Sequence, residues 1–173
     1  MVVSEVLGTM WTARRRSAKK NSKKSAAPSR TEKHAKPSTS KKLSDQSLIR
    51  ADVQSLSGTD FERLMEMYYI DQGYRVNRVG GAGDHEVDLI LQGKEGYKIA
   101  VQCKRWKRDV GNDIVLRLKA GKQVHGCYDA WIVTTSHFTK SAREAAERLN
   151  IKLINGAALQ DKLMRWRKGK RVG

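Results

Sequence analysis

The sequence predicts a mixed α/β fold in which a central sheet carries helices on both faces. Three observations lead to this prediction: amphipathic helical periodicity over residues 57–73, alternating apolar and polar positions in a hairpin over 87–104, and an almost wholly apolar strand over 130–134. The full predicted order is helix, three strands, helix, strand, helix, strand, helix.

The first predicted helix has one buried face. Its apolar residues recur at the i, i+3, i+4, i+7 and i+8 positions, namely Phe61, Leu64, Met65, Tyr68 and Tyr69. Thr59 and Glu62 have the spacing of a capping box, and Gly73 is expected to end the helix.

The three strands that follow are predicted at 74–79, 87–92 and 97–104, with a turn at Gly-Lys-Glu-Gly between the last two. Because side chains alternate along a strand, Ile99, Val101 and Cys103 should share one face. Gln102 and Lys104 should share the other.

The second half of the chain contains helical patterns at 112–124 and 138–149, a last short strand at 151–154, and a closing helix lined by Leu159, Leu163 and Trp166. The hydroxyl residues 134–136 follow the apolar strand, where they could cap the next helix.

The charge of the chain indicates a polyanionic partner. Its 173 residues suit one domain, and 35 Lys and Arg against 18 Asp and Glu give a net charge of +17. Residues 1–42 hold twelve of these bases and two acids, so we expect a disordered basic arm there and a folded domain over 43–173. One alternative is that the arm is an organellar transit peptide. Another is an RNA-binding or membrane-surface protein whose binding depends on the arm alone.

Two other classes of protein are not indicated. No run approaches the roughly 20 apolar residues needed to cross a bilayer, so no membrane span is expected. Cys103 and Cys127 form no CxxC pair and have no clustered histidines beside them, which argues against a disulfide framework and against a zinc site.

The hairpin carries a set of groups suited to phosphodiester hydrolysis. The Asp88 carboxylate, the Gln102 amide oxygen and the backbone carbonyl of Cys103 are oxygen ligands of the kind Mg²⁺ prefers. Lys104 leaves the same face as Gln102 and could orient the attacking water. The alternatives are a surface ion pair between Asp88 and Lys104, and a Gln102 that is simply hydrogen-bonded within the sheet.

Two segments beside this set are candidate DNA contacts. The basic cluster after the third strand comprises Arg105, Trp106, Lys107 and Arg108, and the loop before the second strand offers Gly81, Gly83 and His85. Each segment has a plainer interpretation as a solvated loop.

Six segments give a more specific signal: SGTDFERLM at 57–65, GYRV at 73–76, GGAGDHEVDLIL at 80–91, VQCKRW at 101–106, IVTTSHFTKSA at 132–142 and INGAAL at 154–159. In this order and spacing they resemble the Mrr-like restriction endonuclease family, a D…QxK variant of the PD-(D/E)xK nuclease superfamily. The resemblance implies a restriction-endonuclease-like αβββαβ core.

It further implies that Asp88, Gln102 and Lys104 are catalytic, with Gln102 in the usual glutamate position, and that Glu62 supports the metal. Glu62 could instead be only the capping residue. The family commonly has glycine where this chain has His85-Glu86, so a second acid could stand near the metal.

The implied function is a Mg²⁺-dependent (or Mn²⁺-dependent) endonuclease that cuts double-stranded DNA in restriction or repair. The implied setting is the prokaryotic cytoplasm, at the nucleoid, and cutting both strands would favour a homodimer. The alternative is a DNA-binding module that keeps the fold and has lost cleavage, because relatives often carry a separate DNA-binding domain.

Overall fold

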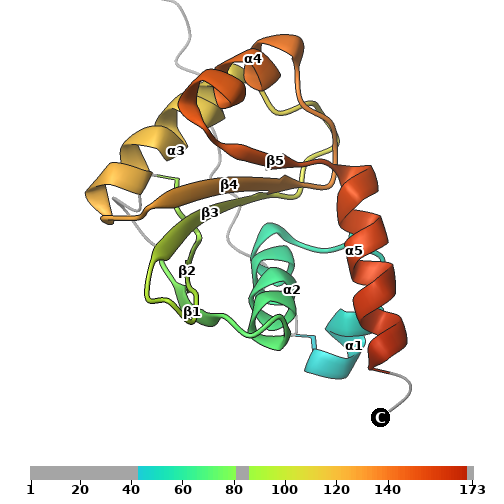
Figure 1. Ribbon diagram of the computed structural model, residues 1–173. Helices are drawn as coiled ribbons and strands as arrows, with labels where there is room; N and C mark the ends of the chain where they lie inside the picture. Colours follow the sequence, from blue (N-terminus) through green and yellow to red (C-terminus); the bar gives the residue numbers. More distant parts are fainter. Residues whose placement is uncertain (1–42, 81–85, 171–173) are drawn as a thin grey trace, which may run out of the picture. The chain divides into compact units, whose positions relative to one another are not determined.

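The computed structural model describes residues 43–80 and 86–170, and these form a mixed five-stranded sheet (Figure 1). The strands are β1 (Arg75–Arg78), β2 (Leu89–Gln92), β3 (Lys98–Lys104), β4 (Asp129–Thr134) and β5 (Lys152–Ile154), in the spatial order β1-β2-β3-β4-β5. The first three strands are antiparallel, whereas β3, β4 and β5 are parallel. The predicted mixed sheet is therefore confirmed.

Helices cover both faces of the sheet, as predicted. One face packs against α2 (Gly58–Asp71) and α5 (Gly156–Gly169), with the short α1 (Asp45–Arg50) beside them, and the other packs against α3 (Asn112–Val124) and α4 (Lys140–Leu149) (Figure 1). Each face has its own cluster of buried apolar side chains. The buried positions of α2 are Phe61, Leu64, Met65, Tyr68 and Tyr69, the residues that its periodicity indicated.

Strand β3 is the central strand, and it is buried on both faces. Ile99, Val101 and Cys103 belong to the cluster beneath α2, while Ala100 belongs to the cluster beneath α3 and α4. Leu89 lies opposite Val101 and Lys104 lies opposite Thr134. The end of β3 thus lies between the start of β2 and the end of β4.

The predicted capping box of α2 is wrong. The N-cap is Ser57, whose hydroxyl accepts a hydrogen bond from the Asp60 backbone N–H at 3.0 Å and contacts the Asp60 carboxylate at 2.7 Å. Ser57 and Asp60 have the same three-residue spacing as Thr59 and Glu62, and the helix begins two residues earlier than the proposed box required. The Glu62 side chain is consequently not a capping group.

Other differences lie at the ends of elements. Helix α1 was not predicted, because six residues with one buried side chain, Leu48, show no helical periodicity. Helix α2 ends as expected, with Gln72 as C-cap and Gly73 at a φ of +88°. Within residues 43–80 and 86–170 there is no helix with the length and apolar character that a membrane span requires.

Candidate active site

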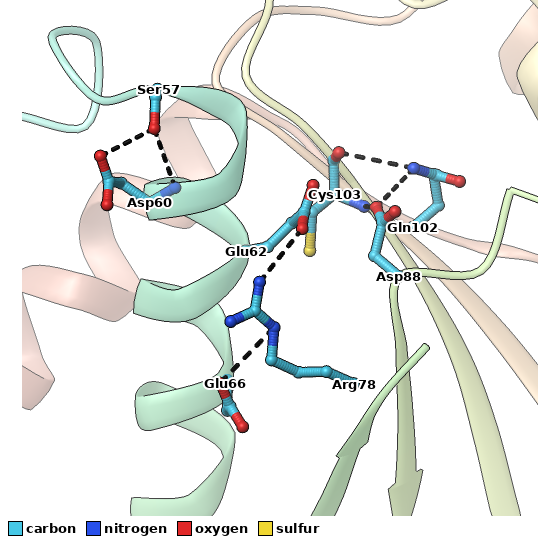
Figure 2. A network of polar contacts seen from close by, with 8 residues as sticks. All are labelled: Ser57, Asp60, Glu62, Glu66, Arg78, Asp88, Gln102 and Cys103. Carbon is cyan, nitrogen blue, oxygen red and sulfur yellow. Dashed lines mark hydrogen bonds and ion pairs between the residues drawn. The ribbon is translucent and has the colours of Figure 1, made fainter. Parts of the chain in front are cut away.

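The Asp88 carboxylate lies where β2 and β3 begin to pair. The Asp88 N–H donates to the Val101 carbonyl at 2.9 Å, which holds Asp88 against β3 immediately before the Leu89–Val101 pair. Its Oδ2 then accepts two hydrogen bonds, from the Cys103 N–H at 2.7 Å and from the Gln102 amide Nε2 at 2.5 Å (Figure 2). The hairpin therefore brings together Asp88, Gln102 and Cys103, the three residues proposed from the sequence to bind a metal.

The Gln102 side chain is buried at the centre of this group, with 1% exposure. Its Nε2 contacts Asp88 and, at 3.5 Å, the Cys103 carbonyl. Its Oε1 is buried and has no hydrogen-bond partner among the described residues. A buried acceptor without a donor lowers the free energy of unfolding, so a donor or a cation beside Oε1 would stabilise the site.

Glu62 approaches the same group from helix α2. Figure 2 shows its carboxylate beside Cys103, on the side away from Gln102. Arg78 on β1 contacts Glu62 at 3.5 Å and Glu66, one helical turn further on, at 3.7 Å. Strand β1 thus fixes the face of α2 that carries both carboxylates.

The Cys103 thiol is surrounded by groups that keep it protonated. Burial raises its pKa well above the usual value, and the nearby carboxylates of Asp88 and Glu62 raise it further. A neutral thiol is a poor metal ligand, so the group of Cys103 suited to a metal is its backbone carbonyl and not its sulfur.

The oxygen groups of this site fit a hard divalent cation. Carboxylate, amide and backbone carbonyl oxygens are the ligands of Mg²⁺ and Mn²⁺. In the part of the chain that the structure describes, no three His, Cys, Asp or Glu side chains are grouped as a metal site, so a metal bound here would need Gln102 and a backbone carbonyl as ligands. Ligation by Gln102 requires its amide to present Oε1, in place of Nε2, toward Asp88.

Lys104 lies at the end of β3, two residues after Gln102. Its Nζ forms an ion pair with the Glu86 carboxylate at 2.7 Å, and Arg117 of α3 contacts the other Glu86 oxygen at 3.2 Å. The Lys104 and Glu86 side chains are only 18% and 22% exposed. A largely buried ion pair therefore lies beside the Asp88–Gln102 group.

The basic loop after β3, residues 105–108, is attached to the end of β4 by side-chain hydroxyls. The Thr134 hydroxyl donates to the Lys104 carbonyl at 2.8 Å, the Thr135 hydroxyl to the Trp106 carbonyl at 3.1 Å, and the Ser136 hydroxyl to the Lys107 carbonyl at 3.5 Å. Thr139, and not these three residues, is the N-cap of α4. These hydroxyls therefore hold the loop and do not cap the next helix.

Within this loop the Trp106 ring is contacted by two cations. The Arg108 guanidinium lies 4.3 Å from the ring centroid and the Lys104 ammonium lies 5.5 Å from it. Lys107 and Arg108 are exposed, whereas Arg105 is partly buried and its Nε has no partner among the described residues.

A comparison with protein families decides what kind of domain this is. The family model described as a restriction endonuclease domain, Mrr_cat, matches residues 53–163, which is more than half of the chain. The chain belongs to the Mrr restriction endonuclease family. The match covers every element of this Mrr domain from α2 to β5, and it includes Glu62, Asp88, Gln102 and Lys104.

The solved structures that resemble this domain do so at low sequence identity. The restriction endonuclease AspBHI, described as DNA modification-dependent, has a TM-score of 0.51 at 18% identity, over 72% of this chain and 39% of its own. A repair endonuclease from Pyrococcus abyssi has a TM-score of 0.47 at 17% identity, over 61% and 49%. A crystallised protein of unknown function has a TM-score of 0.47 at 20% identity, over 54% and 55%.

This Mrr chain therefore spans about half the length of those last two structures. No match was found among the curated proteins.

Sequence reasoning missed several residues of this site. Arg78, Glu66 and Arg117 were not predicted, although the four-residue spacing of Glu62 and Glu66 places both carboxylates on one helix face. Glu86 was considered as an acid near the metal, and the structure places it against Lys104. The proposed contacts at Gly81, Gly83 and His85 lie outside the described residues.

Proposed function

We propose that this chain is a divalent-metal-dependent endonuclease that hydrolyses the phosphodiester bonds of double-stranded DNA. The observation that carries the proposal is the contact of the Asp88 carboxylate with Gln102 and Cys103, with Lys104 at the end of the same strand as Gln102, in a domain of the Mrr family. The Asp88 carboxylate and the Cys103 carbonyl lie on the same side of the Gln102 amide, and both are oxygen groups of the kind that a hard cation binds.

In this proposal Asp88, Gln102 and the Cys103 carbonyl hold Mg²⁺ or Mn²⁺, and Glu62 contributes from α2. The bound cation supplies charge neutralisation at the phosphate and lowers the pKa of the attacking water. Lys104 donates a hydrogen bond to the attacking water or to a phosphate oxygen, which stabilises the negative charge that develops in the transition state.

We further propose that Arg105, Trp106, Lys107 and Arg108 contact the DNA backbone beside the scissile bond. Their loop is continuous with β3, and its carbonyls are held by β4, so these side chains are presented at the end of the catalytic strand. Phosphate contacts of this kind position DNA without reading its sequence. Residues 1–42 would act as a basic arm that adds salt-dependent affinity to the catalytic domain at 43–173.

The proposed biological role is restriction of foreign or modified DNA, or repair, at the nucleoid of a prokaryotic cytoplasm. Because each chain would carry one catalytic centre, cutting both strands favours a homodimer.

The test is cleavage of supercoiled plasmid and duplex oligonucleotides by the purified full chain, with Mg²⁺, with Mn²⁺ and with EDTA. We expect cutting with either cation and none with EDTA. Lys104→Ala should lower the cleavage rate by about 10²- to 10⁴-fold. The matched control is Lys98→Ala, because Lys98 is an exposed lysine on the same strand and face, at the other end. Equal cleavage by the two variants would contradict the proposed mechanism.

The alternative function is a DNA-binding module without catalysis. The hydrogen bond from Gln102 Nε2 to Asp88 favours it, because the amide already satisfies one carboxylate oxygen that a cation would need. DNA binding by the parent protein without cleavage under any of these metal conditions would decide for this alternative.

A further inference from the structure

Glu86 has a backbone conformation that its side chain disfavours. Its φ is +63°, and among the described residues Asn150, at +52°, is the other non-glycine residue with a positive φ. Asn150 is the C-cap of α4, where a left-handed residue is common and asparagine is among the residues that tolerate it. Glu86 ends none of the helices that the structure describes, and glycine would adopt its conformation without the steric cost that a Cβ brings.

The side chain of Glu86 accounts for this conformation. Its two carboxylate oxygens contact two cations from different elements, Lys104 at the end of β3 and Arg117 on α3. Strained residues of this kind persist where the surrounding structure determines them, and they are found in particular at functional sites.

Glu86 also provides the Lys104 ammonium with a negative charge that Gln102, on the same strand, does not offer. Lys104 has four rotatable side-chain bonds, and the residue two positions before it, Gln102, carries no charge to attract it. The Asp88 carboxylate is engaged by the Cys103 N–H and by Gln102. The 2.7 Å ion pair with Glu86 supplies a fixed negative charge to the Lys104 ammonium.

We propose that Glu86 is a positioning residue that holds the Lys104 ammonium beside the Asp88–Gln102 group, and that Arg117 fixes the orientation of Glu86. This inference rests on the proposed nuclease function. Glu86 acts through Lys104 and does not itself bind the cation, because both of its oxygens are occupied by basic side chains.

The principal test is Glu86→Gly, which removes the carboxylate and suits the backbone. The glycine relieves the left-handed backbone but leaves Lys104 and Arg117 without their shared carboxylate, so the two effects on the melting temperature oppose each other. We expect kcat to fall about 10²-fold because Lys104 is misplaced. The DNA Kd should change little. The matched control is Asn150→Gly, which relieves the other left-handed residue and should leave cleavage at the parent rate.

A conservative variant separates the carboxylate from the backbone. Glu86→Asp keeps a carboxylate and tolerates the left-handed region better than glutamate, so it should recover part of the activity that Glu86→Gly loses. Glu86→Gln keeps the length without the charge and should stay close to Glu86→Gly.

Metal titration distinguishes a positioning residue from a ligand. The Mg²⁺ concentration that gives half-maximal cleavage should be the same for the parent and for Glu86→Gly. A rise of tenfold or more would make Glu86 a ligand and overturn the inference. A Glu86→Gly variant that cuts as fast as an active parent would also overturn the inference, and it would leave the nuclease proposal intact. A parent protein that does not cut would overturn both.

Discussion

Gln102 gives the candidate centre one negative charge fewer than a glutamate would. As described above, its amide donates to Asp88 and leaves Oε1 without a partner among the described residues. Without a cation there is no charge repulsion between these two side chains, because Asp88 faces a neutral amide and not a second carboxylate. A cation binding here must therefore compete with an existing hydrogen bond, and we expect its affinity to be low.

The substitution Gln102→Glu tests this expectation. It removes the donor to Asp88 and places two carboxylates together, so the melting temperature in EDTA should fall. Mg²⁺ should restore it, because a ligand that binds only the native state stabilises that state. The Mg²⁺ concentration for half-maximal cleavage should decrease by about tenfold, equivalent to ~1.4 kcal/mol of binding free energy.

The control for this variant is Gln160→Glu, which makes the same charge change at an exposed position of α5. Thermal scans of both variants with EDTA and with Mg²⁺ are the measurement. If Gln102→Glu melts at the same temperature in both solutions, then no cation binds between residues 88 and 102.

Strand alternation is sufficient to predict which residues share this site but not how they contact one another. It placed Gln102 and Lys104 on one face and Asp88 on the adjacent strand, and the structure brings the Asp88 carboxylate to the Gln102 amide. The contact of Lys104 with Glu86 could not be predicted, because it depends on a left-handed backbone that residue type does not indicate for glutamate. The contribution of Arg78 depends on β1 crossing the face of α2, which is a tertiary contact.

At the scale of secondary-structure elements, the segment after β4 positions the basic loop. Thr134, Thr135 and Ser136 bind the carbonyls of the loop through their side chains. From the other side, the Gly156 N–H donates to the Ser136 carbonyl at 2.8 Å, where α5 begins. A Cβ on Gly156 would lie 2.4 Å from the Thr135 carbonyl oxygen, so glycine is required for this close approach.

Gly156→Ala should therefore destabilise the domain by about 1–3 kcal/mol, because backbone atoms cannot move aside as a side chain can. The displaced Thr135 should also weaken DNA binding through the loop. The matched control is Gly58→Ala at the first position of α2, where an added Cβ meets nothing within 4 Å. Urea unfolding of both variants measures the difference, and equal stability would show that β4 and α5 can separate without cost.

The order and type of the long elements were predictable because each has a strong period. Helix α3 has the bounds that the sequence indicated, and β4 differs by one residue. The N-terminus of α2 was predicted two residues too late, because two Ser/Thr-to-acid pairs with capping spacing overlap there and residue type does not rank them. Helix α1 depends on Leu48 packing against the rest of the domain, which its six residues alone do not reveal.

For the molecule as a whole, charge is unevenly distributed along the sequence. The described domain uses acidic residues to hold basic ones in place at the site, as in the Lys104–Glu86–Arg117 group. Residues 1–42 carry twelve bases and two acids, so their excess charge has few acidic residues nearby in sequence. Our proposal assigns affinity mainly to the arm and cleavage to the domain.

Deletion of residues 1–42 should separate these functions. DNA affinity at moderate salt should fall at least about tenfold, and the plot of log Kd against log salt should become shallower, because fewer counterions are released. At low salt the truncated chain should cut at the parent rate. Fluorescence anisotropy across a salt series, together with cleavage assays, measures both effects. Loss of cleavage at low salt would place part of the catalytic function in the arm.

Arg78 contacts two carboxylates of α2, and the second contact bears on cation binding by the first. The Glu62 carboxylate that would bind a cation contacts the Arg78 guanidinium through one oxygen, at 3.5 Å. Glu66 lies one turn further along α2 and already contacts Arg78 at 3.7 Å. If Glu62 binds a cation as proposed, Glu66 would remain as a carboxylate partner of Arg78, and the guanidinium would keep a negative charge beside it.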